Sequence, residues 1–375
     1  MHFRSLALVV FASGCALVDA SGKEHGPGAA NSYKDPISLP ASANPRSAAI
    51  AELDGAPGPD VAVVREDGSV QFFLQMGVTG QFQMVPPPQG LAGYTTILSA
   101  NLDMDDGFSE LVAAGPGKLD VIVHDVGQPD MLRKISLVVP SGFMPRAIAA
   151  SGVDPASSLL VAADATSRQV FVFRNPLGAP SPMIFMADDI ANDVAIADVD
   201  ASMPGPEVIV SHANHITTVS ASLARFDKDL VPGTQARFLA LGDFGGGPAP
   251  DVAYQALSQG PGEIGFMFGS PSGLVPQTTF TGQGTAGDAL LGADVDGDGV
   301  SDLVSVFTET SSGKRMLEFF VRDPGNPMPL QFRESTLTVQ ARALTIATGD
   351  LNLDGRADFV LVPARLNGVD VIESN

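Results

Sequence analysis

The chain has 375 residues, of which 42 are acidic and 21 basic, so its formal net charge is −21 at pH 7. This charge repels nucleic-acid phosphates and anionic lipid headgroups, which argues against nucleic-acid binding, and it attracts divalent cations. Forty glycines, 29 prolines and no tryptophan, in a chain with 45% hydrophobic residues, predict many short buried elements joined by tight turns.

Residues 1–20 are a predicted secretory signal with an apolar stretch at 6–12. Two modes of processing fit it. Residues 12–15, ASGC, resemble a bacterial lipobox in which Cys15 is lipidated, although alanine stands where leucine is usual. Residues 18–20, VDA, offer an ordinary cleavage site instead. We favour lipidation, because Cys15 is the only cysteine of the chain and lies where a lipobox requires it.

Residues 21–34 are rich in glycine, alanine and polar groups without periodicity, which predicts a flexible tether. Residues 35–375 form the predicted folded domain. No later segment reaches 18 unbroken apolar residues, so we expect membrane contact only through a lipid anchor. The expected location is extracytoplasmic, either anchored to a bacterial cell envelope or secreted or periplasmic.

An acidic motif stands out at residues 293–304, ADVDGDGVSDLV, which contain Asp294, Asp296, Asp298 and Asp302. Four carboxylates this close repel one another unless a cation lies between them. An EF-hand is excluded, because its twelfth position is Ser305 rather than glutamate and short strand-like runs flank the loop. The motif is therefore predicted to be a metal-type turn between two strands.

The motif recurs along the chain. One copy contains Asp350, Asn352, Asp354 and Asp358, and another, with one inserted residue, contains Asn101, Asp103, Asp105 and Glu110. Weaker copies complete a set whose final positions are Asp60, Glu110, Leu159, Glu207, Asp251, Asp302 and Asp358. These positions are 44 to 56 residues apart. Seven units at a period near 50 indicate a repeat architecture.

Each unit is predicted to be a four-stranded antiparallel meander, as in the first unit, where strands are expected at 48–53, 60–64, 70–75 and 82–85. Four strands per 40–50 residues match a propeller blade, so we predict an all-β, seven-bladed β-propeller. The last unit has only three strands, and residues 36–40, PISLP, precede the first unit. We predict that this N-terminal strand completes the last blade and closes the ring.

The pattern D-x-[DN]-x-D-G-x-x-D before an apolar strand resembles the FG-GAP or VCBS repeat, found in the propeller of integrin α subunits and in secreted or lipid-anchored bacterial proteins. Residues 265–274, GFMFGSPSGL, resemble the strand-and-turn signature of that family. The resemblance covers residues 36–375 and implies the architecture and calcium-binding loops. It implies no particular function, because this repeat serves adhesion, lectin, lyase and scaffold proteins.

Calcium suits the motif because it takes six to eight oxygen ligands, and alternate residues of a tight loop point inward. We expect two or three structural Ca²⁺ sites, in the turns of units six, seven and two, with ligands drawn from the acidic and asparagine residues named above. Asp298→Asn is expected to mimic part of the effect of calcium removal.

The chain shows no nucleophile elbow, P-loop or zincin motif. His212 and His215 form H-x-x-H without an evident third ligand, which is interpreted as turn polarity. The leading hypothesis is a noncatalytic, calcium-binding propeller that acts as a scaffold or binding module for a protein or other macromolecule at the cell envelope. The alternatives are a carbohydrate-binding lectin, disfavoured by three tyrosines and no tryptophan, and a secreted polysaccharide-acting enzyme.

Overall fold

The computed structural model describes residues 33–374 with internal gaps. The gaps are residues 42–43, 78–79, 87–88, 104–107, 126–127, 153–156, 204, 221–222, 231–234, 246, 248, 258–260, 310–314, 323–329, 331, 340–342 and 364–366. The predicted signal, Cys15, most of the tether and Asp105 therefore lie outside the described residues. No helix of the described part is long and apolar enough to cross a membrane.

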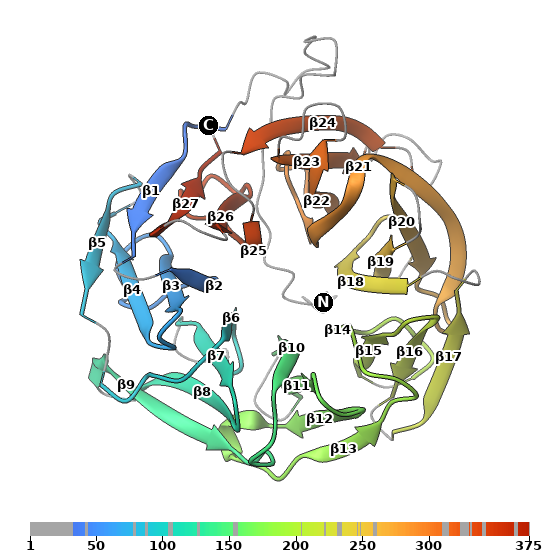
Figure 1. Ribbon diagram of the computed structural model, residues 1–375, viewed down its shortest axis with the longest axis horizontal. Coiled ribbons are helices and arrows are strands. Elements are labelled where there is room, and N and C mark those ends of the chain that lie inside the picture. The colour runs from blue at the N-terminus through green and yellow to red at the C-terminus, as the bar shows by residue number, and fades with distance from the viewer. Residues whose placement is uncertain are drawn as a thin grey trace, which may run out of the picture.

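Seven blades of antiparallel strands stand in a ring around a central axis, which confirms the predicted all-β propeller (Figure 1). Within each blade the strands run in order from the axis to the rim. The described part contains one short helix, a 3₁₀ turn at Pro176–Gly178 in the third blade.

The first blade comprises β2 (Pro45–Ala51), β3 (Asp60–Arg65), β4 (Val70–Gln75) and β5 (Phe82–Val85). The second comprises β6 (Thr96–Ala100), β7 (Glu110–Gly115), β8 (Lys118–Asp125) and β9 (Gln128–Leu137). The third comprises β10 (Pro145–Ser151), β11 (Leu159–Asp164), β12 (Gln169–Arg174) and β13 (Met183–Met186). The fourth comprises β14 (Asp193–Ala197), β15 (Glu207–Ser211), β16 (His215–Val219) and β17 (Arg225–Asp229).

The fifth blade comprises β18 (Gln235–Gly242), β19 (Asp251–Leu257), β20 (Pro261–Phe268) and the first part of β21 (Val275–Ala293). The second part of β21 is the inner strand of the sixth blade, which continues with β22 (Asp302–Glu309), β23 (Arg315–Arg322) and β24 (Phe332–Val339). The seventh comprises β25 (Ala343–Gly349), β26 (Asp358–Pro363), β27 (Gly368–Ile372) and β1 (Ile37–Pro40). The continuous β21 joins two blades in one seven-stranded sheet, which the sequence did not reveal.

Ring closure follows the prediction. Strand β1 pairs with β27 in antiparallel register, with Ile37 opposite Val371 and Pro40 opposite Gly368. The outermost strand of the last blade therefore comes from the N-terminal end of the domain. This pairing ties the two ends of the folded domain together.

The second strand of each blade is an apolar run because neighbouring blades cover both of its faces. Every residue of β7, β11, β15 and β26 is buried. Among the described residues the core divides into seven hydrophobic clusters, one at each interface between neighbouring blades. Closure is completed by the cluster that packs Val360 and Val371 of the last blade against Val61 and Phe73 of the first.

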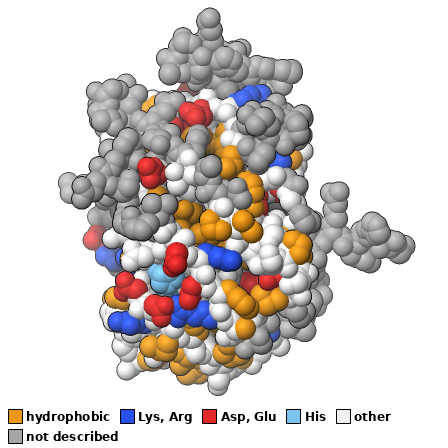
Figure 2. Space-filling model, turned by 90° about the vertical axis from the view of Figure 1, so that its right-hand side faces the viewer, with side chains coloured by type: hydrophobic (Ala, Val, Ile, Leu, Met, Phe, Trp, Pro, Cys, Tyr) orange, Lys and Arg blue, Asp and Glu red, His pale blue; other side chains and the backbone are white. Residues whose placement is uncertain are grey.

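The rim differs from this interior. Each outer strand has one hydrogen-bonded neighbour in its own blade, and several outer strands expose large apolar side chains. These side chains are Met84 on β5, Ile184 and Met186 on β13, Phe226 on β17 and Val275 on β21. Figure 2 shows hydrophobic side chains distributed over one side of the ring.

The last two residues of the predicted tether contact the propeller. Tyr33 is buried, stacks on Phe319 of the sixth blade and meets Phe359 of the seventh edge-on. Lys34 Nζ lies 2.8 Å from Glu373 Oε2. The chain therefore enters its folded domain with an aromatic ring set between two blades.

Candidate functional site

The turn of the sixth blade, between β21 and β22, gathers three carboxylates. Single oxygens of Asp294, Asp296 and Asp302 lie within 4.8 Å of one another. The two oxygens of Asp294 accept the backbone N–H groups of Gly297 and Gly299, each at 2.8 Å, which holds the turn in place. The geometry offers a cation three carboxylate ligands from one tight loop.

The charges of this turn are poorly compensated within the protein. Burial and the neighbouring Asp298 and Asp294 raise the pKa of Asp296 to about 6. Burial raises the pKa of Asp302 well above its usual range, and Arg333 Nη2, 3.3 Å from Asp296 Oδ2, offsets only part of the negative charge. A divalent cation would favour the ionised carboxylates, as metals do at such sites.

Asp298, a predicted ligand, lies outside this group. It is exposed, and its Oδ1 accepts the N–H of Val300 at 2.8 Å. Its role within the described structure is to close the turn rather than to join the three converging carboxylates.

The turn of the seventh blade is arranged differently. The side-chain nitrogen of Asn352 donates to the carbonyl of Ser374 at 3.0 Å, and its oxygen accepts the N–H of Asp354. Asp350 accepts the N–H groups of Asp354 and Gly355, and the Ser374 hydroxyl donates to Asp354 Oδ2. The carboxylates here do not form a convergent group like that of the sixth blade.

In the second blade the turn is described only in part. Asn101 and Asp103 lie on its near side, while Asp105 is outside the described residues. Glu110 is buried, and its Oε2 accepts the N–H of Leu102 at 2.5 Å. The predicted ligand set of this blade therefore stays a prediction.

The first blade contains a carboxylate group that the sequence analysis did not select. Oxygens of Glu52, Asp54 and Asp60 lie within 4.8 Å of one another. Gln75, 1% exposed, abuts this turn at Gly58. Its side-chain amide makes no hydrogen bond within the described part of the chain. The spacing of the three acids matches that of 294, 296 and 302, which is the signal that could have identified them.

The final acid of the repeat has a second role, which the structure shows in several blades. Asp60 accepts the N–H groups of Leu53 and Gln75, and Asp302 those of Val295 and Arg322. The same bonds are made by Asp251 to Gly245 and Gly269, and by Asp358 to Leu351 and Ser374. Each carboxylate thus joins the first turn of its blade to the end of the third strand.

The third blade has no acid at the final position, and it makes the link to the end of its third strand in another way. Leu159 occupies the final position there, and the N–H of Asn175 instead donates to the carbonyl of Ser158 at 3.0 Å. A main-chain carbonyl therefore replaces the carboxylate as the acceptor at the end of the third strand.

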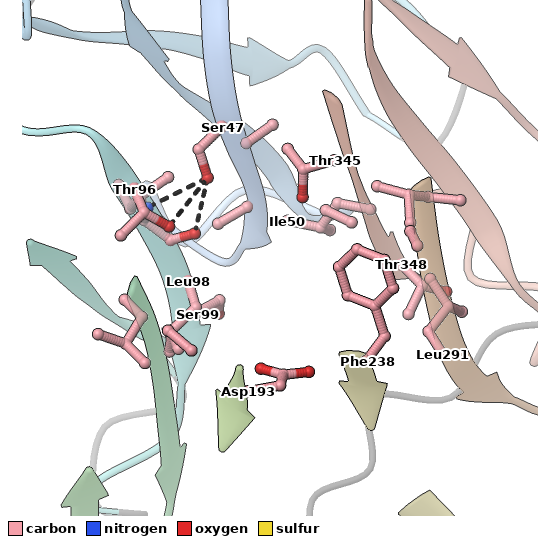
Figure 3. Close-up of a pocket in the computed structure, with 18 of the residues that line it drawn as sticks. Ser47, Ile50, Thr96, Leu98, Ser99, Asp193, Phe238, Leu291, Thr345 and Thr348 are labelled. Carbon is pink, nitrogen blue, oxygen red and sulfur yellow. Dashed lines mark hydrogen bonds between the residues drawn. The ribbon is translucent and has the colours of Figure 1, made fainter. Parts of the chain in front are cut away.

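A cavity of about 380 Å³ lies on the axis of the ring and is lined by the inner strands. Its polar side chains include Ser47, Thr96, Asp193, Thr345 and Thr348 (Figure 3). The Ser47 hydroxyl accepts the N–H of Ile97 at 3.2 Å, which links the first two blades. Phe238 supplies an aromatic ring beside Asp193.

Asp193 is the carboxylate of this cavity. Its Oδ2 accepts the N–H of Leu239, where a bulge interrupts the pairing of β18, and its Oδ1 accepts the N–H of Val194. Burial raises its pKa to about 6, although the two backbone donors and the charge of Arg146 act in the opposite direction. Asp193 therefore links the fourth and fifth blades at the channel wall.

The ring, the repeated turns and the closure by the N-terminal strand define the class: the protein is a seven-bladed β-propeller. No protein-family model matches the chain, and no curated protein matches it in sequence. Among solved structures, BBS1N in complex with ARL6DN is similar at 11% identity and a TM-score of 0.65, covering 91% of this chain and 96% of that one. Virginiamycin B lyase from Staphylococcus aureus is similar at 11% identity and a TM-score of 0.58, covering 90% and 99%. At these identities the likeness shows the fold alone.

Proposed function

We propose that the protein is a noncatalytic, extracytoplasmic propeller of the FG-GAP/VCBS type that binds a protein partner at its rim and uses calcium to hold its turns. The proposed binding role rests on the outer strands at the rim of the ring. Within the described residues, the outer strands there pair along one edge only, and they expose Ile184, Met186 and Phe226 at 47%, 56% and 45%. Free strand edges and exposed apolar side chains are features that protein partners use.

Calcium is supported by the carboxylate groups of the first and sixth blades. Hard oxygen donors in a tight turn are the ligands that calcium prefers, and their negative charge is poorly compensated without a cation. Asp294, Asp296 and Asp302 would hold one ion, and Glu52, Asp54 and Asp60 another. In both of these blades the bound ion would fix the turn between the first and second strands.

The extracytoplasmic location rests on the predicted signal at residues 1–20 and on Cys15 as a lipid attachment point. A surplus of 21 negative charges suits a compartment rich in calcium. A noncatalytic role is supported by the axial cavity, where both oxygens of Asp193 already accept backbone N–H groups.

The test is capture from a native cell-envelope extract in calcium, using the tagged chain and one rim variant for each of three blades. The variants are Met84→Ser, the double change Ile184→Ser and Met186→Ser, and Phe226→Ser. We expect one variant to lose a specific, saturable partner at least tenfold while the other two retain it and serve as matched controls. Equal capture by all three would contradict rim binding. Specific binding on a glycan array, or cleavage of a polysaccharide by the purified chain, would replace the proposal with a lectin or an enzyme.

A further inference from the structure

The third strand of the first blade ends in a buried glutamine whose side chain has no partner. Gln75 is the last residue of β4 and is 1% exposed. Within the described residues, neither the oxygen nor the nitrogen of its side-chain amide makes a hydrogen bond. Buried amide groups are normally paired, because leaving one without water or another partner destabilises the folded protein. The Gln75 amide is therefore a candidate for contact with a ligand.

This amide lies against the acidic turn between β2 and β3. A Cβ at Gly58 would lie 3.1 Å from Oε1 of Gln75 and 3.3 Å from its Nε2, so glycine at this position leaves the space that the amide fills. The main chain is fixed at the same place, since the N–H of Gln75 donates to Asp60 Oδ1 at 2.7 Å. An uncharged oxygen thus adjoins the turn in which the carboxylates of Glu52, Asp54 and Asp60 converge.

The seventh blade shows where a side chain at this position points. Ser374 lies just beyond β27 and donates its N–H to Asp358, which is the bond that Gln75 makes to the final acid of the first blade. The hydroxyl of Ser374 also donates to Asp354 and Asp358, so this side chain reaches the acids of its own turn. The end of the third strand therefore directs its side chain toward the acidic turn of the same blade.

The other residues at this position offer no free oxygen. Gly269 has no side chain, and Arg322 carries a positive charge and donates its Nη1 to the carbonyl of Asp243 at 2.7 Å. The hydroxyl of Ser374 is already engaged with two carboxylates. Of these four residues, whose N–H groups all bond to the final acid of a blade, Gln75 alone presents a neutral oxygen that has no partner among the described residues.

We propose that Gln75 is a ligand of the calcium ion in the first blade and binds it through the amide oxygen, beside the carboxylates of Glu52, Asp54 and Asp60. Calcium takes six to eight oxygen ligands, and the side-chain carbonyl of glutamine is among those it accepts. The inference rests on the proposed calcium site of this turn and adds a ligand from another strand. The bound ion would therefore join the turn to the end of β4. The sixth blade has no such ligand, since Arg322 stands at the equivalent position.

The test measures Ca²⁺ binding to the full chain by titration calorimetry, after metal has been removed with EDTA. The double change Glu52→Gln and Asp54→Asn should remove one ion per chain, which identifies the binding step of the first blade. Gln75→Met keeps the length of the side chain without its oxygen and should weaken that step about tenfold. Gln75→Glu supplies a charged oxygen and should strengthen it about tenfold, because the affinity of calcium sites rises with ligand charge. Without calcium, Gln75→Glu should unfold at lower urea than wild type, because it adds a fourth carboxylate to the turn.

Gln71→Met is the matched control. Gln71 is a second buried glutamine of β4, at 4% exposed, but its amide nitrogen donates to the carbonyls of Phe72 and Val85. This variant should bind calcium with the affinity of the wild type, even if the lost hydrogen bonds make it less stable.

Wild-type affinity in Gln75→Met would overturn the role of Gln75. Equal or weaker binding by Gln75→Glu would overturn it as well, and weaker binding is expected if the amide instead donates hydrogen bonds to the carboxylates. Should Gln75→Met not fold, the direction of the change in Gln75→Glu decides the question. An unchanged number of bound ions in the double variant of Glu52 and Asp54 would contradict the first-blade calcium site itself. Loss of that ion in the double variant, with no effect of either change at Gln75, would remove only the added ligand.

Discussion

At the scale of single residues, one carboxylate position explains why acids recur through the chain. Asp60, Asp251, Asp302 and Asp358 each bridge backbone N–H groups of a turn and of the third strand. This role persists in the fifth blade, where the turn has lost most of its other acids. Retention of the final acid therefore does not by itself indicate a calcium site. The proposed calcium sites are the two turns in which two further carboxylates converge with it.

Calcium binding at the sixth blade is tested by Asp296→Asn, with the exposed Asp298→Asn as its control. Calcium should raise the free energy of unfolding of the wild type by about 2 kcal/mol per site at well-saturating concentration. Asp296→Asn should reduce that gain yet stabilise the calcium-free protein, because it removes a repelling charge. Asp298→Asn should have a smaller effect. Coincident thermal melts in EDTA and in calcium would contradict calcium binding by the folded protein.

The pH dependence of stability is tested by Asp251→Asn. Burial raises the pKa of Asp251 from 3.8 to about 6, so the folded protein holds this proton more tightly than the unfolded chain. The contribution of protonated Asp251 to the free energy of unfolding is complete below pH 3.8 and is lost as the pH rises through about 6. The change is on the order of 3 kcal/mol or less. The unfolding free energy of wild type relative to the variant should therefore fall between pH 4 and pH 7, as measured by urea denaturation. Parallel curves would contradict the assignment.

At the scale of elements, the inner strands approach one another closely because their blades converge on the axis. A Cβ at Gly292 of β21 would lie 2.0 Å from the carbonyl oxygen of Leu241 in β18, and one at Gly152 would lie 1.7 Å from that of Asn101. Both contacts join neighbouring blades. Glycine at these positions therefore sets the distance between blades.

Gly292→Ala tests this packing, with Gly142→Ala as its control, since a Cβ at Gly142 would meet nothing within 4 Å. We expect Gly292→Ala to lower the free energy of unfolding by about 2–3 kcal/mol, because a backbone carbonyl cannot move aside as a flexible side chain can. Gly142→Ala should stay within about 0.5 kcal/mol of wild type. Equal urea midpoints for the two variants would show that the inner strands tolerate wider spacing.

At the scale of the whole molecule, the ring is closed by segments from opposite ends of the domain. Strand β1 completes the last blade, Leu39 lies in the cluster between the last and first blades, and Tyr33 packs between the sixth and seventh. The predicted N-terminal closure is confirmed.

Deletion of residues 35–41 should lower the melting temperature by more than about 10 °C, because it exposes the edge of β27 and opens a core cluster. Leu39→Ala should cost about 2–4 kcal/mol, while Ser38→Ala, which removes one exposed hydrogen bond to Asp370, should cost less than about 1 kcal/mol. Calorimetric melts of the three variants measure these effects. An unchanged melt after the deletion would contradict closure by this strand.

The sequence by itself determined the number of blades, the strands within them and the origin of the closing strand. These features depend on local turn chemistry and on a repeat period that neighbouring residues express directly. Only the tertiary structure decided that Glu52, Asp54 and Asp60 converge while Asp298 does not, that β21 serves two blades, and that His212 is buried beside His215. Burial depends on how segments distant in sequence pack against one another, and convergence depends on the backbone path of each turn. Residue spacing selects the candidate turns, but it fixes neither the path of their backbone nor the packing around them.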